Sequence, residues 1–228
     1  AEGGTGASPA SSMRFAGSSP EIGISETQQT LVKNGLRGHV RLQVDGQLKT
    51  GRDIITMALL GAEEFGFGTL TLIVLGCVMM RKCNLNTCPL GVTTQNPDLR
   101  AHFIGKYEYL VNYFTFLAQE VREYLAEMGY THLNDIVGHT ELLIKRKAND
   151  EKTATLDFTR LLAKEQGNSA MHHTTNQNHT INDVLDRQII RAAQKAIDNK
   201  EEVNLDYAIK NTDRATGTML SGEIASRY

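Results

Sequence analysis

The chain has 228 residues, of which 40% are hydrophobic and 22% are charged, and its formal net charge is −2 at pH 7. This composition is that of an ordinary globular protein, and it lacks the positive charge that would favour binding to nucleic acid or to an anionic membrane. The longest apolar stretch, residues 70–80, has about half of the roughly 20 residues that a membrane-spanning helix needs. We therefore expect no nucleic-acid partner, no membrane segment and no signal peptide.

All three cysteines of the chain, Cys77, Cys83 and Cys88, lie within one twelve-residue stretch. An odd number of closely spaced cysteines makes a poor disulfide framework, because neighbouring cysteines close only very short loops. In a reducing compartment the same cluster indicates a bound metal. The sequence therefore predicts a metal site within residues 77–88, in a protein of the cytoplasm or of an equivalent reducing compartment.

The first part of the chain predicts a loop and then a helix. Residues 1–23 are rich in Gly, Ser and Pro, a composition typical of loops whose backbone passes close to a ligand. Ser25 is suited to cap the first helix, and Gly38 is suited to end it. We therefore expect the helix to span the residues between these two.

A strand, a helix and a second strand are expected next. Residues 40–44 alternate apolar and polar side chains and are followed by Asp-Gly, as is typical of a strand and its turn. Residues 52–64 place their apolar side chains on one helical face, and residues 64–69 indicate a short strand that opens into a glycine-containing turn. This order predicts a βαβ unit with parallel strands.

The rest of the chain is predicted to be mainly helical. We expect these further elements: helices over residues 97–128, 131–148 and 183–197, a polar linker over residues 164–182, and a strand over residues 203–209 followed by glycine-spaced segments. The helix over residues 97–128 carries the aromatic residues Tyr107, Tyr109, Tyr113, Phe114 and Phe116. Their spacing is typical of side chains that pack a helix into a core.

The spacing of the cysteines favours iron over zinc. Structural zinc sites use four ligands, commonly from two C-x2-C pairs, and the C-x5-C-x4-C run fits that pattern poorly, although His102 offers a fourth ligand downstream. A four-iron cluster also takes four thiolates, whereas three thiolates suit a 3Fe–4S cluster. Buried free thiols are a third interpretation, which the clustering disfavours. We therefore place an iron–sulfur cluster ahead of zinc, and both ahead of inert thiols.

Glycines follow both predicted strands. Gly46 and Gly51 come after the first strand, and residues 66–69 end the second. In a (β/α)8 barrel, the loops after the last two strands commonly bind phosphate through backbone N–H groups. Turn geometry also requires glycine, so these residues alone are weak evidence. Beside a cluster that carries electrons, a flavin phosphate is a sensible ligand.

Four segments, taken in order, closely resemble the large subunit of glutamate synthases. They are EGGTGASP, LQVDGQLKTGRDIITMALLGAEEFGFGT, GCVMMRKCNLNTCPLGV and NTDRATGTMLSGEIASRY. In that family a (β/α)8 barrel holds FMN, a 3Fe–4S cluster is bound beside it by three cysteines in this spacing, and a right-handed β-helix domain follows. The resemblance runs through essentially the whole chain, which begins and ends without a change in composition, so we expect an excerpt of a longer protein.

The resemblance implies an α/β fold in two parts. Residues 1–163 would form the C-terminal part of the FMN-binding barrel, with the iron–sulfur loop at residues 77–88 and a helical extension over residues 97–163. Residues 164–182 would be the linker, and residues 183–228 would begin the β-helix domain. A piece with so few strands cannot close a barrel, so we expect the chain to be inactive alone.

The resemblance also implies a reaction, in which the amide nitrogen of glutamine is transferred to 2-oxoglutarate and the product is reduced to L-glutamate. Electrons would pass through the cluster to FMN, from an NADPH-dependent small subunit or from ferredoxin. The implied site residues are the cluster ligands Cys77, Cys83 and Cys88, the FMN phosphate contacts Gly46, Gln47, Gly68 and Thr69, and at the same rim Gly3 and Gly4. We assign no catalytic acid or base. Another FMN and iron–sulfur barrel oxidoreductase, or a zinc-stabilised binding module, is the alternative.

Overall fold

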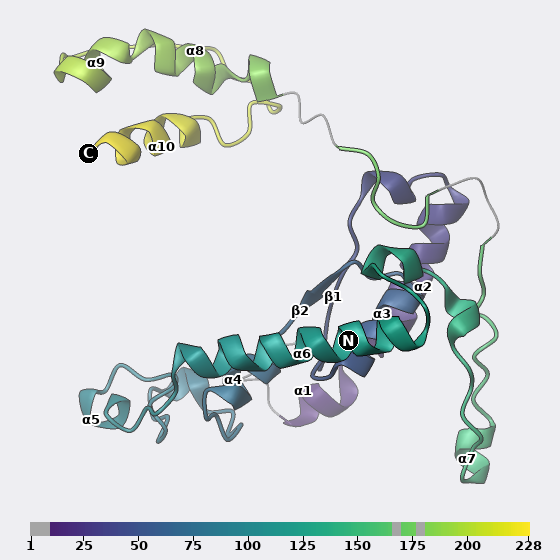
Figure 1. Cartoon of the computed structure of the whole chain (residues 1–228). Helices are drawn as coiled ribbons and strands as arrows, with labels where there is room; N and C mark the ends of the chain where they lie inside the picture. Colours follow the sequence, from purple (N-terminus) through teal and green to yellow (C-terminus); the bar gives the residue numbers. More distant parts are fainter. Residues whose placement is uncertain (1–9, 166–169, 177–180) are drawn as a thin grey trace. The chain divides into compact units, whose positions relative to one another are not determined.

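The computed structural model describes residues 10–165, 170–176 and 181–228, which fall into two compact units (Figure 1). The first unit extends to residue 176 and the second begins at residue 177. The division lies inside the predicted linker over residues 164–182, and the boundaries of that linker stay a prediction. The first unit contains helices and one small parallel sheet, an α/β arrangement.

The predicted βαβ unit is confirmed. Strand β1 (Gln43–Asp45) pairs in parallel with β2 (Glu64–Gly66), in a register that sets Asp45 beside Gly66. Helix α3 (Gly51–Leu60) connects the two strands and is ended by Gly61, whose φ is +125°. The strands are shorter than predicted because, among the described residues, each has only one neighbour to supply hydrogen bonds.

Helix α2 (Pro20–Lys33) begins earlier than predicted, so the assignment of Ser25 as its cap is wrong. Proline favours the first position of a helix, because its fixed φ is already helical and it has no N–H to satisfy. Ser25 instead lies buried inside the helix, where its hydroxyl donates to the carbonyl of Leu161 at 2.5 Å.

The core of the first unit surrounds α3. Helix α6 (Tyr107–Glu127) lies along α3 and along α4 (Thr69–Val74), and its Leu117 and Leu125 are buried in these contacts (Figure 1). Among the aromatic residues of α6, Tyr113 and Phe114 pack against the core as predicted. Tyr107 and Phe116 are 73% and 72% exposed. The prediction that these aromatic side chains pack into the core is therefore wrong for these two.

The long helix predicted over residues 97–128 is interrupted. It forms α5 (Pro97–Arg100) and α6, and residues 101–106 between them are not helical. Gly105 lies in this break, where an added Cβ would be 2.8 Å from the carbonyl oxygen of Leu75. Glycine at this position permits the close approach of the two backbones, and it also disfavours the interior of a helix.

The prediction of a helix over residues 131–148 is wrong. Two short 3-10 turns, η3 (Leu133–Ile136) and η4 (Thr140–Leu142), stand in its place. Between them Gly138 has φ +75°, while Ile136 and Val137 are fully buried. Tertiary burial of these two side chains therefore overrides the helical pattern. The remaining elements of the first unit are α1 (Ala10–Phe15), η1 (Arg37–His39), η2 (Cys83–Leu85) and α7 (Glu151–Ala154).

The second unit is helical in its described residues. The helix predicted over residues 183–197 is interrupted at Ala193 and forms α8 (Leu185–Ala192) and α9 (Gln194–Asn199), preceded by the turn η5 (Ile181–Asp183). The strand predicted over residues 203–209 is wrong, because this segment has no regular structure.

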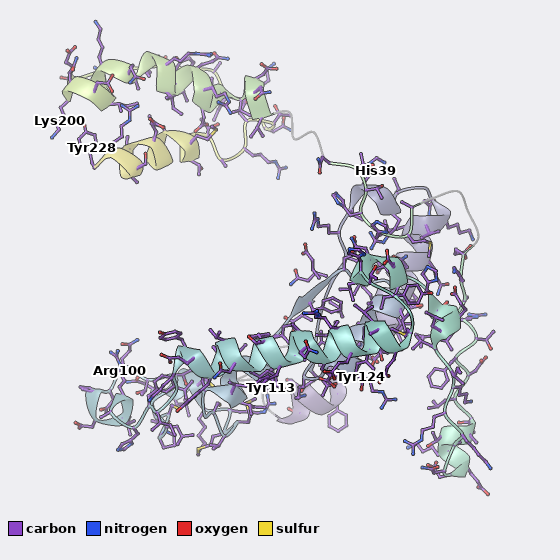
Figure 2. The ribbon with its side chains drawn as sticks, viewed as in Figure 1. His39, Arg100, Tyr113, Tyr124, Lys200 and Tyr228 are labelled. Carbon is purple, nitrogen blue, oxygen red and sulfur yellow. The ribbon has the colours of Figure 1, made fainter. Side chains whose placement is uncertain are left out.

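Helix α10 (Thr218–Arg227) closes the second unit. The hydroxyl of Tyr228 donates to the carbonyl of Ile197 at 2.6 Å, and Lys200 Nζ lies 5.2 Å from the centre of the Tyr228 ring (Figure 2). The assignment of this unit as the start of a β-helix domain stays a prediction. Across the part of the chain that the structure describes, no helix has the length and apolarity to cross a bilayer.

Candidate functional site

The three cysteines face one hollow. Cys77 follows α4 through Gly76, whose φ is +95°, and the chain then runs through the turn η2 to Cys88. All three are free thiols and line the same hollow, together with apolar side chains that include Leu72, Met80, Leu90 and Val92. The three residues that the sequence predicts as cluster ligands therefore line one hollow.

Backbone N–H groups are directed at two of the three sulfur atoms, those of Cys77 and Cys88. The N–H of Met79 donates to Cys77 Sγ at 3.3 Å. The N–H of Thr93, helped by those of Leu90 and Val92, holds the pKa of the Cys88 thiol below its ordinary value, although burial opposes this effect. The nearby Thr93 hydroxyl also lowers the pKa of Cys88. It does not meet the geometry of a hydrogen bond, and among the described residues this buried hydroxyl has no hydrogen-bond partner. This environment favours thiolate sulfur.

The donor chemistry fits an iron–sulfur cluster, but the thiols are not drawn together. No three His, Cys, Asp or Glu side chains in the described ranges are grouped closely enough to hold a metal ion. The hollow has a volume of about 30 Å³, roughly the volume that one molecule occupies in liquid water. His102, the fourth ligand considered for zinc, does not line the hollow, and its Nδ1 lies 3.1 Å from the carbonyl oxygen of Pro89. A cluster bound by all three thiols would require them to lie closer together than they do here.

The predicted phosphate residues lie at one edge of the small sheet. Gly46 and Gln47 follow β1, and Gly68 and Thr69 follow β2, so parallel pairing brings both pairs to the same edge. Gly46 has φ +141° and Gln47 has φ +58°. An added Cβ at Gly68 would meet open space, which leaves its backbone accessible. Gly3 and Gly4 lie outside the described residues.

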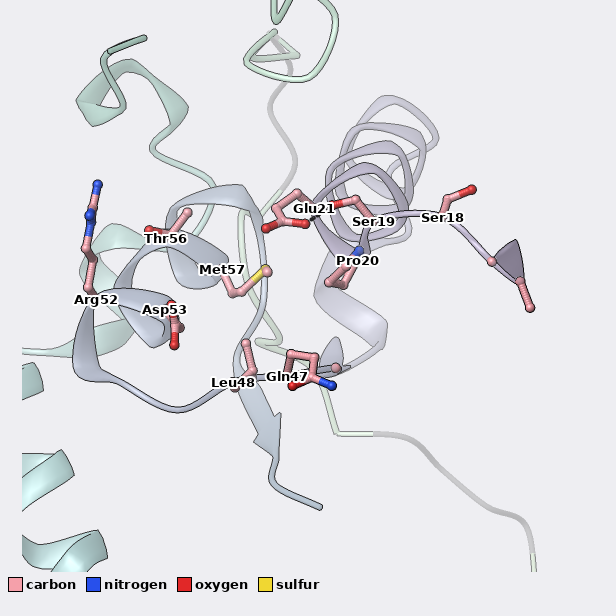
Figure 3. A pocket seen from close by; sticks show the side chains of 13 residues that line it. Ser18, Ser19, Pro20, Glu21, Gln47, Leu48, Arg52, Asp53, Thr56 and Met57 are labelled. Carbon is pink, nitrogen blue, oxygen red and sulfur yellow. Dashed lines mark hydrogen bonds between the residues drawn. The ribbon is translucent and has the colours of Figure 1, made fainter. Parts of the chain in front are cut away.

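The first pair lines a cavity. Gly46 and Gln47 border a space of about 610 Å³, whose wall is completed by the segment before α2 and by one face of α3 (Figure 3). The polar side chains on this wall are those of Ser18, Ser19, Glu21, Gln47, Arg52, Asp53 and Thr56. Gly68 and Thr69 do not line this space. The structure thus provides one polar cavity at the edge, with both charge signs on its wall.

The N-terminus of α3, where Gly51 lies, already has protein partners. Thr50 and Asp53 form a capping box, and the N–H groups of Lys49 and Thr50 each donate to Asp53 Oδ2 at 2.9 Å. Burial raises the pKa of Asp53, but these hydrogen bonds outweigh it and leave the pKa below its ordinary value. The N–H of Gly51 donates to Glu120 Oε2 at 2.7 Å. A phosphate must therefore use the earlier part of this loop.

Sequence reasoning missed Glu120 and Tyr113 of α6. Glu120 accepts from Gly51, and the Tyr113 hydroxyl donates to the carbonyl of Lys49 at 2.9 Å. The two residues are seven positions apart, which places them on the same face of a helix after two turns. That spacing was visible in the sequence, but nothing in it identified the partner loop.

Residues 1–131 match the family described as a conserved region in glutamate synthase. This chain belongs to the glutamate synthase family. It is 46% identical over 230 residues to the large chain of the NADPH glutamate synthase of Bacillus subtilis (strain 168), covering 100% of this chain and 15% of that relative. It is 46% identical over 232 residues to the ferredoxin-dependent glutamate synthase of Spinacia oleracea, covering 100% of this chain and 14% of the relative.

A third relative differs in its electron donor. The NADH glutamate synthase of Schizosaccharomyces pombe is 43% identical over 230 residues, covering 100% of this chain and 11% of the relative. The chain thus spans about 15% or less of the length of these glutamate synthases. Since NADPH, NADH and ferredoxin types match it to a similar degree, the identities do not distinguish the donor.

Proposed function

We propose that this chain is part of the synthase region of a glutamate synthase large chain. The complete protein would transfer the amide nitrogen of glutamine to 2-oxoglutarate and reduce the product to L-glutamate. Its partners would be 2-oxoglutarate, glutamine-derived ammonia, and a donor of electrons that is either an NADPH-dependent small subunit or ferredoxin. The observation that carries the proposal is the convergence of three free thiols on one hollow, directly after the helix that follows β2.

In this proposal the chain has two tasks, to hold an iron–sulfur cluster and to bind the phosphate of FMN. Bound FMN supplies hydride chemistry and a 3Fe–4S cluster supplies single electrons. Cys77, Cys83 and Cys88 would be the cluster ligands, and the N–H groups directed at the sulfurs of Cys77 and Cys88 would stabilise these two thiolates. We propose a reducing compartment such as the cytoplasm, because three closely spaced cysteines make a poor disulfide framework.

The residues at the sheet edge fit a phosphate group. Gly46 and Gly68 have no side chain of their own, and an added Cβ would meet open space at Gly68 and the Pro20 ring at 3.6 Å at Gly46, so both positions allow the close approach that phosphate binding requires. Gln47 and Thr69 add polar side chains to the two loops. These residues would bind and orient the cofactor, while the apolar side chains around the cysteines would exclude water from the cluster.

The test is low-temperature EPR of the air-oxidised full-length protein that contains this sequence, together with its iron and acid-labile sulfide content. An oxidised 3Fe–4S cluster is paramagnetic, whereas zinc is silent. We expect a signal that Cys83→Ser abolishes. Stoichiometric zinc without a signal would contradict the proposal and leave the cysteines as a structural site.

A second expectation concerns the isolated chain. Two short parallel strands leave the edges of this sheet unpaired in the described residues, and they cannot close a barrel. We therefore expect the 228-residue chain to form no glutamate from glutamine and 2-oxoglutarate. Measurable product, with a donor of electrons present, would show that no further domain is needed.

A further inference from the structure

Two side chains of α6 hold the loop between β1 and α3. Glu120 Oε2 accepts the N–H of Gly51 at 2.7 Å, and the Tyr113 hydroxyl donates to the carbonyl of Lys49 at 2.9 Å. Tyr113, labelled in Figure 2, lies in the N-terminal third of α6 and packs against the core cluster of Ile54, Leu70 and Leu117. Helix α6 thus binds both an N–H group and a carbonyl group of the loop backbone, those of Gly51 and Lys49. These two contacts restrict the movement of the loop relative to α6.

The contact at Gly51 is close as well as polar. An added Cβ on Gly51 would lie 2.8 Å from Glu120 Cγ and 3.0 Å from Glu120 Cβ. The carboxylate of Glu120 therefore meets the first N–H of α3, where a negative charge is favoured by the helix dipole. A glycine is required at this position because any side chain would push Glu120 away.

The same loop contains the residues proposed for the FMN phosphate. Gln47 has φ +58°, a conformation that a non-glycine residue keeps only when its surroundings fix it. Lys49 Nζ donates to Gln47 Oε1 at 2.6 Å, so the residue that Tyr113 holds in turn contacts Gln47. The contacts made by α6 thus extend to the residues at the cavity.

Helix α6 also supports the segment that leads to the cysteines. Leu117, which lies between Tyr113 and Glu120 in the sequence, packs with Leu70 of α4 and Ile54 of α3 in one buried cluster. Cys77 comes three residues after the end of α4. A single helix therefore contacts both the proposed flavin loop and the helix that precedes the first cysteine.

We propose that Glu120 and Tyr113 are positioning residues, which hold the loop of residues 46–51 in the conformation that binds the FMN phosphate. This inference rests on the proposed function. It assigns neither residue to the chemistry, because both reach the loop backbone from the side of α6. It predicts that their removal weakens FMN binding while the iron content stays unchanged.

The experiment compares Glu120→Ala, Glu120→Gln and Tyr113→Phe in the full-length protein, with Glu127→Ala as the matched control. Glu127 is exposed on the same helix. The readouts are the dissociation constant of FMN for protein stripped of flavin, hydrogen exchange of the peptide covering residues 46–52, and iron content. We expect Glu120→Ala to weaken FMN binding roughly tenfold or more and to speed exchange in that peptide.

The conservative variants separate positioning from general damage. Gln keeps an oxygen that can accept from Gly51, so Glu120→Gln should recover most of the affinity, and Tyr113→Phe should weaken binding less than Glu120→Ala. Glu127→Ala should behave as the wild type. Unchanged FMN affinity in Glu120→Ala and Tyr113→Phe, or loss of iron to the same degree as flavin, would overturn the inference.

The two proposals fail in different ways. A wild-type protein that binds no FMN contradicts the proposed function. Hydrogen exchange does not depend on flavin, so unchanged exchange at residues 46–52 in Glu120→Ala would overturn the positioning role whether or not FMN binds.

Discussion

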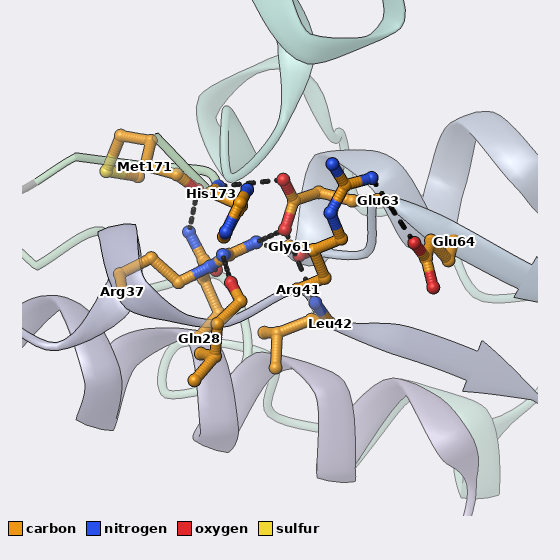
Figure 4. Close-up of polar contacts among 10 residues, drawn as sticks. Gln28, Arg37, Arg41, Leu42, Gly61, Glu63, Glu64, Met171 and His173 are labelled. Atoms are coloured by element: carbon orange, nitrogen blue, oxygen red, sulfur yellow. Dashed lines mark hydrogen bonds and ion pairs between the residues drawn. The ribbon is translucent and has the colours of Figure 1, made fainter. Parts of the chain in front are cut away.

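Arg37 and Glu63 form a buried ion pair, in which Nη2 of Arg37 lies 2.6 Å from Oε2 of Glu63 and the side chains are 0% and 8% exposed (Figure 4). Three further guanidinium N–H groups donate to Gln28 Oε1 and to the carbonyls of Val40 and Gly61. The pair therefore joins helix α2, the approach to β1 and the end of α3.

Glu63 extends this network to a distant part of the chain. Its Oε1 accepts the N–H of His173 at 2.7 Å, and Gln28 donates to the carbonyl of Met171 at 2.9 Å (Figure 4). The carbonyl of Gly38 accepts the N–H groups of Thr174 and Thr175, each at 3.0 Å. Residues 170–176, predicted as part of a linker, are thus bound to the first unit.

Replacement of Arg37 should destabilise the first unit strongly. Arg37→Met leaves the carboxylate of Glu63 buried without its cation, which costs about 3–5 kcal/mol. The matched control is Arg41→Met, since Arg41 lies 3.4 Å from Glu64 in an exposed pair, 62% and 46% exposed, of the kind that contributes about 1 kcal/mol or less. Urea unfolding of the two variants measures the difference. Equal losses of unfolding free energy would contradict a special role for Arg37.

Stability should fall in acid, in part through Glu63. Burial raises the pKa of this carboxyl, but the N–H of His173 and the guanidinium of Arg37 outweigh burial and leave the pKa below its ordinary value. A carboxyl whose pKa is lower in the folded chain stabilises the fold above its unfolded pKa of about 4.3, and this stabilisation is lost as the pH falls through the folded value.

Glu63→Gln isolates this contribution. The variant has no carboxyl to protonate at this position, so its unfolding free energy should decline less steeply than that of the wild type as the pH falls below about 4.3. Urea unfolding at a series of pH values gives both slopes. The absolute stability of Glu63→Gln is expected to be lower throughout, because Arg37 loses its counter-charge. Parallel curves for the two proteins would exclude Glu63 as a source of the acid sensitivity.

The sequence predicted those features of the fold that have local causes. The alternation in residues 40–44 and the helical face of residues 52–64 led to the βαβ unit, and the capping box of Thr50 and Asp53 accompanies the start of α3. The three cysteines came to one hollow because they are close in sequence. In each case the interacting residues are near neighbours along the chain.

Features that depend on distant contacts were missed or predicted wrongly. Glu63 and His173 are 110 positions apart, and no periodic pattern connects them. The helical pattern of residues 131–148 gave way to burial of Ile136 and Val137 and to a left-handed Gly138. Likewise, the partner of Gly51 is 69 positions away on α6, so the sequence alone left the N-terminus of α3 open to phosphate.

Gly61 should be intolerant of a side chain. Its φ of +125° disfavours L residues, and an added Cβ would lie 2.5 Å from the Cβ of Gln28, whose side chain is held by Arg37 and Met171. We expect Gly61→Ala to cost about 2 kcal/mol or more. Gly23→Ala is the control, because Gly23 lies inside α2 with nothing within 4 Å and alanine there should stabilise by about 0.5–1 kcal/mol. Thermal or urea unfolding gives both values, and a neutral Gly61→Ala would contradict the contact with Gln28.

In the second unit, the carboxylate of Asp186 on α8 caps the N-terminus of α10. Asp186 is only 5% exposed, and its carboxylate accepts from the N–H groups of Gly217 and Met219 at 2.9 Å, at the start of a helix that has no side-chain cap of its own. Asp186→Ala leaves these donors without an acceptor, at a cost of about 1–2 kcal/mol.

Amide hydrogen exchange can show whether the loss of stability in Asp186→Ala is confined to the second unit. Asp186→Ala should speed exchange throughout α10, whereas amides of α3 in the first unit should be unaffected, since the contact lies within the second unit. Asp186→Asn keeps one acceptor oxygen and should give an intermediate rate. Asp183→Ala removes an exposed carboxylate three positions earlier and serves as the control. If α10 exchanges in Asp186→Ala as slowly as in Asp183→Ala, its stability comes from packing against α8 and not from this carboxylate.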